Sequence, residues 1–361
     1  MSLSLLAMTI QIMKIGFYSP YLDTLGGGER YVLTLASHWS GRHNVELFWN
    51  DASIINSAQK RLNIDLSRIK VTRNIFRDTS VFKKLFITRQ YDLIFFLSDG
   101  SIPSTLARYN ILHFQMPFGK ILYSAVKLSR YQAIVCNSQF TKDALDERIG
   151  IRAEVIYPPV TVIDWKGSKK EKIILSVGRF SGFHTAKKQH ILLEAFTRGM
   201  KAKCLAGWKL ILAGGLLLSD MEYFDTLKKM SVGLPVEFLP NAPHDTLTDL
   251  YRRVSIYWHA AGFGETDPRL MEHFGISTVE AMTAGCIPIV FAGGGQPEIV
   301  EDGKNGFLWE TTGELLEKTN NVIINKNIAA TLQKNAIEKS KQFSVSRFCD
   351  AFDGLLDGIS L

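Results

Sequence analysis

A chain of 361 residues is long for one hydrophobic core and suits two domains of about 150 residues each. Its hydrophobic share of 46% against a charged share of 21% excludes a disordered chain. The net charge of +7 lies entirely in the first half: residues 1–160 hold 19 Lys and Arg against 12 Asp and Glu, whereas residues 161–361 hold 23 of each.

The four cysteines are widely spaced, and no Cys-x-x-Cys pair occurs among them. This pattern favours neither a disulfide framework nor a zinc site, so we expect the protein to reside in the reducing cytoplasm. The apolar stretch Met1–Ile12 has no cationic region before it, which makes it a poor signal peptide. No uncharged run reaches the roughly 20 residues that span a bilayer, so any membrane contact is expected to be peripheral, at the inner face.

Short apolar runs alternate with helical patterns, which predicts βα units and parallel sheets. In the first half the expected strands are Lys14–Tyr18, Val45–Trp49, Lys70–Thr72, Leu93–Leu97, Asn110–His113 and Ala133–Cys136. A helix over Glu29–His38 follows Gly26–Gly28 directly. These glycines permit close backbone approach at a helix start, where a phosphate or donor sugar could sit, and a mere turn explains them equally well.

Two prolines in Tyr157–Val160 predict an extended crossing between the halves. Beyond it the expected strands are Lys172–Val177, Lys209–Ala213, Val236–Phe238, Ile256–Trp258, Ile287–Val290 and Gly306–Leu308. Apolar residues at helical spacing predict a last helix over Ser344–Leu356. The sequence therefore predicts an α/β protein with two doubly wound domains, residues 1–160 and 161–343, and a final segment, 344–361.

Glu272 and Glu280 flank a small-residue turn that leads into a helix expected over Val279–Ala284. In one continuous helix the two side chains would be about 80° apart, so we expect Glu272 in the loop. Ser277 or Thr278 is a natural N-cap, and Glu280 then falls in the first turn, where it can accept hydrogen bonds from ribose hydroxyls. The amides expected to be free for a phosphate are those of Phe274, Gly275, Ile276, Ser277 and Thr278. An acidic helix N-terminus without a ligand explains the spacing equally well.

Arg179 follows the strand Lys172–Val177, at the edge where open α/β sheets bind ligands. Its planar guanidinium suits a diphosphate, and Lys187 or Lys188 can supply a further positive charge. The alternative for Arg179 is an ordinary surface charge.

Five blocks resemble the retaining GT-B glycosyltransferases of family GT4: Glu272-x7-Glu280 with residues 281–290, Ser176–Arg179 with Lys187–Phe196, Gly26–Arg30, Asn137–Lys142 and Val155–Val160. The resemblance covers nearly the whole chain from Met13 onward. The run Glu272–Ile276 and the triple glycine are also similar to mannosyltransferase-like members that act on lipid-linked oligosaccharides.

This resemblance implies a GT-B fold, in which two Rossmann-like domains face a central cleft and the last helix packs back on the first domain. It favours Lys187 over Lys188 at the donor diphosphate, across the loop Ser181–Ala186, and leaves Lys188 exposed. The implied catalytic residues are Glu272, His113, Arg179 and Lys187, although a histidine at a strand end is as often structural. The residues implied to bind the donor are Gly27, Gly28, Gly214, Asn241, Phe274, Gly275, Ile276, Ser277 and Glu280.

Two features set this sequence apart. No Asp-x-Asp occurs, so the usual carboxylate pair for a divalent metal is missing, and we expect neither a metal nor a cofactor beyond the nucleotide sugar. The stretch between His259 and Glu272 is longer than in many relatives. This loop either closes over the acceptor or decorates the rim of the site.

Residues 60–89 hold nine basic side chains and two acidic ones. Such a segment attracts anionic lipid headgroups, and its apolar neighbours suit an interfacial helix pair. Nucleic acid is a weaker candidate because no binding motif is present. A solvated basic face with no partner is the simplest alternative.

The sequence thus predicts a retaining, metal-independent glycosyltransferase. It would move a sugar from a UDP- or GDP-sugar to a lipid-linked acceptor, with a soluble glycan or small molecule as the second choice. Two other functions remain open: a catalytically silent nucleotide-sugar binder held at membranes by residues 60–89, and a GT-B sugar-nucleotide epimerase. The sequence does not identify the sugar, the nucleotide or the acceptor.

Overall fold

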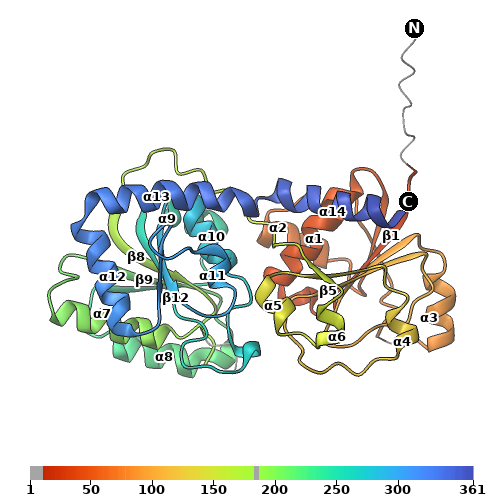
Figure 1. The fold of residues 1–361 in the computed structure, drawn as a ribbon, viewed down its shortest axis with the longest axis horizontal. Helices are drawn as coiled ribbons and strands as arrows, with labels where there is room; N and C mark the ends of the chain where they lie inside the picture. The colour runs from red at the N-terminus through yellow and green to blue at the C-terminus, as the bar shows by residue number, and fades with distance from the viewer. Residues whose placement is uncertain (1–10, 78, 183–186, 361) are drawn as a thin grey trace, which may run out of the picture. The chain divides into compact units, whose positions relative to one another are not determined.

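The computed structural model describes residues 11–77, 79–182 and 187–360. It contains two parallel sheets, one of seven strands in the order β3-β2-β1-β4-β5-β6-β7 and one of six in the order β10-β9-β8-β11-β12-β13 (Figure 1). In each sheet the strand order runs outward in two directions from a central strand, β1 in the first sheet and β8 in the second. This is the doubly wound pattern, which binds ligands at the carboxyl ends of the strands where the order reverses. The predicted α/β class with two Rossmann-like domains is confirmed.

The chain forms two compact units, and each is described by itself. The first unit contains the residues up to Phe114, Ile121–Val135 and the chain from Phe352 onward. The second unit contains Gln115–Lys120 and Cys136–Ala351. Of the sequence features above, residues 1–10, Asp78 and positions 183–186 of the loop Ser181–Ala186 lie outside the described residues.

The first sheet comprises β1 (Lys14–Tyr18), β2 (Asn44–Phe48), β3 (Lys70–Thr72), β4 (Leu93–Leu97), β5 (Tyr109–Phe114), β6 (Ala133–Cys136) and β7 (Ala153–Val155). The helices along this part of the chain are α1 (Gly27–Ser40), α2 (Ile54–Leu62), α3 (Val81–Thr88), α4 (Ala125–Leu128), α5 (Gln139–Asp143) and α6 (Glu147–Gly150). Four of the predicted strands match to the residue, two differ by one residue at each end, and β7 was not predicted.

The second sheet comprises β8 (Glu171–Val177), β9 (Lys209–Gly214), β10 (Val236–Pro240), β11 (Val254–His259), β12 (Ile287–Phe291) and β13 (Phe307–Trp309). Its helices are α7 (Gln189–Lys201), α8 (Met221–Met230), α9 (His244–Arg253), α10 (Ile276–Thr283), α11 (Gln296–Ile299), α12 (Thr312–Ile324), α13 (Lys326–Ser340) and α14 (Val345–Ser360). All six predicted strands are present, with ends that differ by up to two residues.

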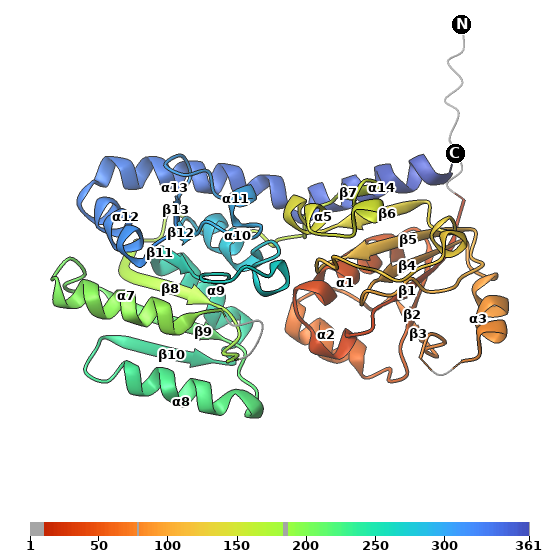
Figure 2. The same cartoon turned by 60° about the horizontal axis from the view of Figure 1, so that its bottom comes forward.

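Alternate residues of the central strands of the second sheet enter two separate cores. In β8, Leu175 packs with residues of α9 and α10, whereas Ile174 packs with residues of α7, α8 and α12. These helices and β8 can be followed in Figure 2. A parallel sheet covered on both faces has continuous apolar strands, which is why these runs were recognisable in the sequence. The covered sheet fixes the carboxyl ends of β8, β9 and β11, where the candidate site lies.

Helix α1 begins two residues earlier than predicted. Oε2 of Glu29 accepts hydrogen bonds from the backbone N–H of Gly26 at 2.8 Å and from the Thr24 hydroxyl at 2.6 Å. This capping interaction satisfies the helix start, so the helix includes Gly27 and Gly28.

The end of α14 packs within the first unit. The Phe352 ring contacts Tyr31 and Trp39 edge-on, with ring centroids 5.8 and 6.1 Å apart. The carboxylate of Asp353 accepts hydrogen bonds from the Trp39 indole at 3.0 Å and from His38 at 3.0 Å. Burial alone would raise the pKa of Asp353, but these hydrogen bonds hold it below its usual range.

Candidate donor-binding site

The loops that follow β8 and β9 approach each other closely. A Cβ atom at Gly214, whose φ is 155°, would lie 1.9 Å from the carbonyl oxygen of Gly178, so only glycine fits there. The side chain of Asn241 closes the same loop, since its amide both donates to and accepts from the backbone of Leu216, at 3.1 and 3.0 Å. Gly214 and Asn241 therefore fix the conformation of the loop after β9, next to the loop that carries Arg179.

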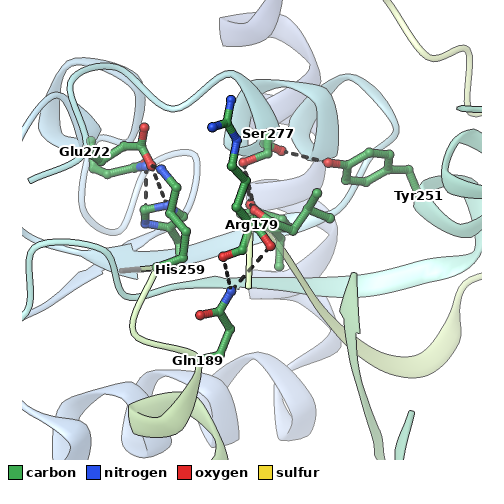
Figure 3. A network of polar contacts seen from close by, with 11 residues as sticks. Arg179, Gln189, Tyr251, His259, Glu272 and Ser277 are labelled. Atoms are coloured by element: carbon green, nitrogen blue, oxygen red, sulfur yellow. Dashed lines mark hydrogen bonds and ion pairs between the residues drawn. The ribbon is translucent and has the colours of Figure 1, made fainter. Parts of the chain in front are cut away.

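Arg179 is exposed, and its backbone is fixed. Its carbonyl oxygen accepts a hydrogen bond from Gln189 at 2.9 Å, and its guanidinium is directed away from Gln189 (Figure 3). An exposed guanidinium on an anchored backbone can bind an anion at little cost in ordering.

Glu272 lies in a loop, as predicted, and is the centre of a charged network (Figure 3). Its Oε2 accepts from Lys187 Nζ at 2.6 Å and from His259 Nε2 at 2.8 Å. Burial disfavours the charged form, but Lys187 and His259 outweigh it and hold the pKa of Glu272 well below its usual range. No described group donates to Oε1, so this oxygen can accept a hydrogen bond from a ligand hydroxyl.

His259 links Glu272 to a buried amide. Its side chain is 2% exposed, and Nδ1 lies 3.4 Å from Nε2 of the fully buried Gln296. Because an amide nitrogen only donates, Nδ1 accepts and Nε2 carries the proton donated to Glu272. Gln296 also fills the space beside Gly275, where a Cβ would lie 2.6 Å from its amide nitrogen.

The helix start differs from the prediction. Helix α10 begins at Ile276 with Gly275 as N-cap at φ 119°, so neither Ser277 nor Thr278 is the cap and Glu280 lies beyond the first turn. The Thr278 amide donates to the Gly275 carbonyl at 3.0 Å and is not free. Within the described chain, the N–H groups from Phe274 to Ser277 have no acceptor. Four amides at a helix start form an anion-binding position.

The Ser277 hydroxyl holds the helix to the sheet instead of capping it. It accepts from Tyr257 at 2.8 Å and donates to the Val177 carbonyl at 3.3 Å. Glu280 is half-buried and accepts from the Tyr251 hydroxyl at 3.2 Å. Ser277 thus places the four amides beside the loop that carries Arg179.

Lys188 is not exposed, contrary to the prediction. Its Nζ lies 2.5 Å from Glu265 and its side chain is only 18% exposed. The ion pair ties the start of α7 to the long loop after β11. Sequence reasoning missed Glu265 and the buried His259 and Gln296, although the unusual length of that loop pointed to the region.

The remaining predicted residues lie in the first unit. Gly27 and Gly28 form the first turn of α1, where Glu29 already occupies the acceptor position at the Gly26 amide. His113 is fully buried: its ring stacks on Tyr31 at 3.9 Å, and Nδ1 donates to the Val135 carbonyl at 3.2 Å. Burial lowers the pKa of His113 to about 3, so the ring is neutral. A catalytic role for His113 stays a prediction.

Residues 163–339 match the family described as glycosyl transferases group 1, and residues 25–162 match Glycosyltransferase Family 4. The chain belongs to the GT4-type GT-B glycosyltransferases. The resemblance seen in the motifs is therefore confirmed.

Several relatives of this GT-B chain carry descriptive names. A Dictyostelium discoideum protein named GDP-Man:Man(3)GlcNAc(2)-PP-Dol alpha-1,2-mannosyltransferase is 27% identical over 69% of this chain and 50% of its own length. An uncharacterised glycosyltransferase of Methanocaldococcus jannaschii is 31% identical over 58% of this chain and 55% of its own. The chain spans about half the length of the curated relatives it matches.

Solved structures support the fold of this GT-B protein. A glycosyltransferase from Rickettsia africae aligns with a TM-score of 0.78 at 16% identity, covering 97% of this chain and 99% of that one. Anabaena HepE in complex with UDP aligns with a TM-score of 0.71 at 22% identity, covering 96% of this chain and 100% of that one.

Proposed function

We propose that the protein transfers a hexosyl group from a nucleoside diphosphate sugar to a lipid-linked saccharide. The observation that carries this proposal is the arrangement around Glu272 in the second unit. Arg179, Lys187 and the four amides from Phe274 to Ser277, which have no acceptor among the described residues, offer positive charge and donors for a diphosphate. The free oxygen of Glu272 offers an acceptor for sugar hydroxyls, and Glu280 offers one for the ribose.

The relatives suggest which donor to test first. The Dictyostelium protein is named for GDP-Man and a PP-Dol-linked acceptor, whereas HepE was solved with UDP and glucose. GDP-mannose with a polyprenyl diphosphate-linked acceptor is therefore our leading pair, and UDP-glucose the second donor. A soluble glycan remains the second acceptor class.

The location that fits this acceptor is the inner face of a membrane, approached from the cytoplasm. In the part of the chain that the structure describes, no helix is both long and apolar enough to cross a bilayer. The excess positive charge of residues 1–160 favours an anionic surface.

The test is transfer from radiolabelled GDP-mannose to a lipid-linked acceptor, with a no-acceptor control. Product formation supports the proposal. Donor binding without transfer would favour a silent binder, and donor isomerisation without acceptor would favour an epimerase.

Transfer should be retaining and independent of metal. Charge that develops on the leaving diphosphate would be stabilised by Arg179, Lys187 and the amides at the start of α10. Within the described residues, no group of three or more His, Cys, Asp or Glu could hold a metal ion. We expect full activity in EDTA and an α-linked product from an α-linked donor, as read by NMR. A β-linkage, or loss of activity restored by Mg²⁺ or Mn²⁺, would contradict this mechanism.

His259 should act as a positioning residue for Glu272. Replacing it by Phe keeps the bulk but removes both hydrogen bonds, so turnover should fall by up to about 100-fold. Binding of free GDP or UDP, measured by calorimetry, should change little, because the diphosphate groups are untouched. Equal losses in nucleotide binding and turnover would instead indicate a general collapse of the site.

A further inference from the structure

The first unit exposes large apolar side chains at one tip. On α3, Phe82 is 87% and Phe86 71% exposed; near α4, Leu122 is 100% and Val126 77% exposed. Phe82 and Phe86 are four residues apart, so they lie on the same face of the helix. Single exposed apolar residues are ordinary, whereas a cluster of this size marks an interaction surface.

Hydrogen bonds join the elements that carry these residues into one surface. The backbone N–H of Leu106 donates to the Thr88 hydroxyl at the end of α3 at 3.0 Å. The Ala107 carbonyl accepts from Arg130, just after α4, at 2.9 Å. Leu106 and Ala107 therefore link the end of α3 to Arg130, two residues after α4. Besides burial, the charge of Lys127 on α4 lowers the pKa of Lys84 on α3, which also requires proximity.

The segments that form this surface carry charge of one sign. Residues 79–91 and 101–135 contain no Asp or Glu. Their basic residues are Lys83, Lys84, Arg89, Arg108, Lys120, Lys127 and Arg130. Lys83, Arg89 and Lys127 are exposed, so the apolar side chains stand among exposed positive charges.

This surface corrects the prediction for residues 60–89. That segment is not a pair of interfacial helices: it contains the end of α2, then β3, then α3. Leu62, Ile69 and Ile75 are 5%, 8% and 4% exposed and belong to the core. Only α3 presents an apolar face outward, and its neighbour there is α4.

We propose that the surface formed by α3, Leu122 and α4, called here the α3–α4 tip, inserts into the headgroup region of an anionic bilayer. Phe82, Phe86 and Leu122 would enter the acyl boundary, while the lysines contact lipid phosphates. An anionic bilayer satisfies both kinds of side chain at once. The inference deepens the proposed function, since an enzyme with a lipid-linked acceptor must reach it at a membrane.

The test is sedimentation of the full chain with vesicles that lack donor and acceptor. We compare phosphatidylcholine vesicles with vesicles containing phosphatidylserine, at physiological salt. The chain should bind the anionic vesicles, and Phe82→Ser with Phe86→Ser should weaken binding by about tenfold or more. Lys83→Glu with Lys127→Glu should abolish the preference for anionic lipid. Val232→Ser with Ile324→Ser is the control, because those residues are 81% and 68% exposed in the second unit.

Two outcomes would overturn the proposal: the unmodified chain stays in the supernatant, or the Phe82/Phe86 variant binds as the control variant does. Either result would favour a protein partner for the tip. Thermal unfolding checks that the variants fold. Vesicle binding needs no donor, so it can fail while transfer to a detergent-solubilised acceptor succeeds. If the chain binds vesicles but transfers sugar to no acceptor, the proposed function is wrong, whereas the proposal that the α3–α4 tip binds membranes is supported.

Discussion

Lys187→Ala should lower turnover by about 10²–10³, the usual effect of removing one preorganised group that stabilises charge in a transition state. Lys187 lies 2.6 Å from Glu272 on the unit that carries Arg179 and the free amides. It is 28% exposed, so its ammonium group can move between the carboxylate and a bound diphosphate. Steady-state kinetics with saturating donor measures the effect.

Lys188→Ala is the matched control. This neighbouring lysine pairs with Glu265 rather than Glu272, so its removal should cost only modest stability and little turnover. Similar losses of turnover in the two variants would show that the wrong lysine has been assigned to the diphosphate.

Lys187→Ala should also change how the stability of the fold depends on pH. The folded-state pKa of Glu272 lies below its unfolded value, so its ionised form stabilises the fold above about pH 4–5, and this contribution is lost as the pH falls further. Without Lys187, only His259 opposes the effect of burial, so that pKa should rise. Between pH 7 and about pH 3, the melting temperature of Lys187→Ala should therefore fall less than that of the unmodified chain. A parallel decline would contradict the role of Lys187 in this shift.

The strands could be predicted because their signal is local. The central strands of both sheets are buried on both faces, so each one is a short apolar run bounded by polar or small residues. β7 has only three residues, one of them the exposed Glu154, and offers no such run. The loop position of Glu272 was also predictable, since helix geometry alone separates it from Glu280.

The helix start was not predictable from neighbouring residues. Ser277 has the right chemistry for an N-cap, but its hydroxyl bonds to Tyr257 and to the end of β8. The cap residue Gly275 must be a glycine, because its φ is 119° and Gln296 fills the space that a side chain would need. Lys188 was misplaced for the same reason, since its partner Glu265 is 77 residues away. In each case a tertiary contact overrides a local rule.

Glu272→Gln and Glu280→Gln should show that the two glutamates bind different parts of the donor. Glu280 sits on α10 with one oxygen on the Tyr251 hydroxyl, and we assign its other oxygen to the ribose. Its replacement should weaken GDP and GDP-mannose alike by about tenfold or more, as expected when a charged acceptor is lost. Calorimetry with both ligands measures this.

Glu272→Gln should behave in the opposite way. Transfer should fall by at least about 100-fold, because the carboxylate that orients the sugar is lost. Free GDP should bind as well as before or more tightly. In the unmodified chain the Glu272 carboxylate neutralises Lys187, whereas the uncharged amide of the variant leaves the positive charge of Lys187 to the diphosphate. Loss of free-nucleotide binding in Glu272→Gln would place this glutamate at the nucleotide and overturn the assignment. Because both variants keep the shape of the side chain, a difference between them reports charge and position rather than packing.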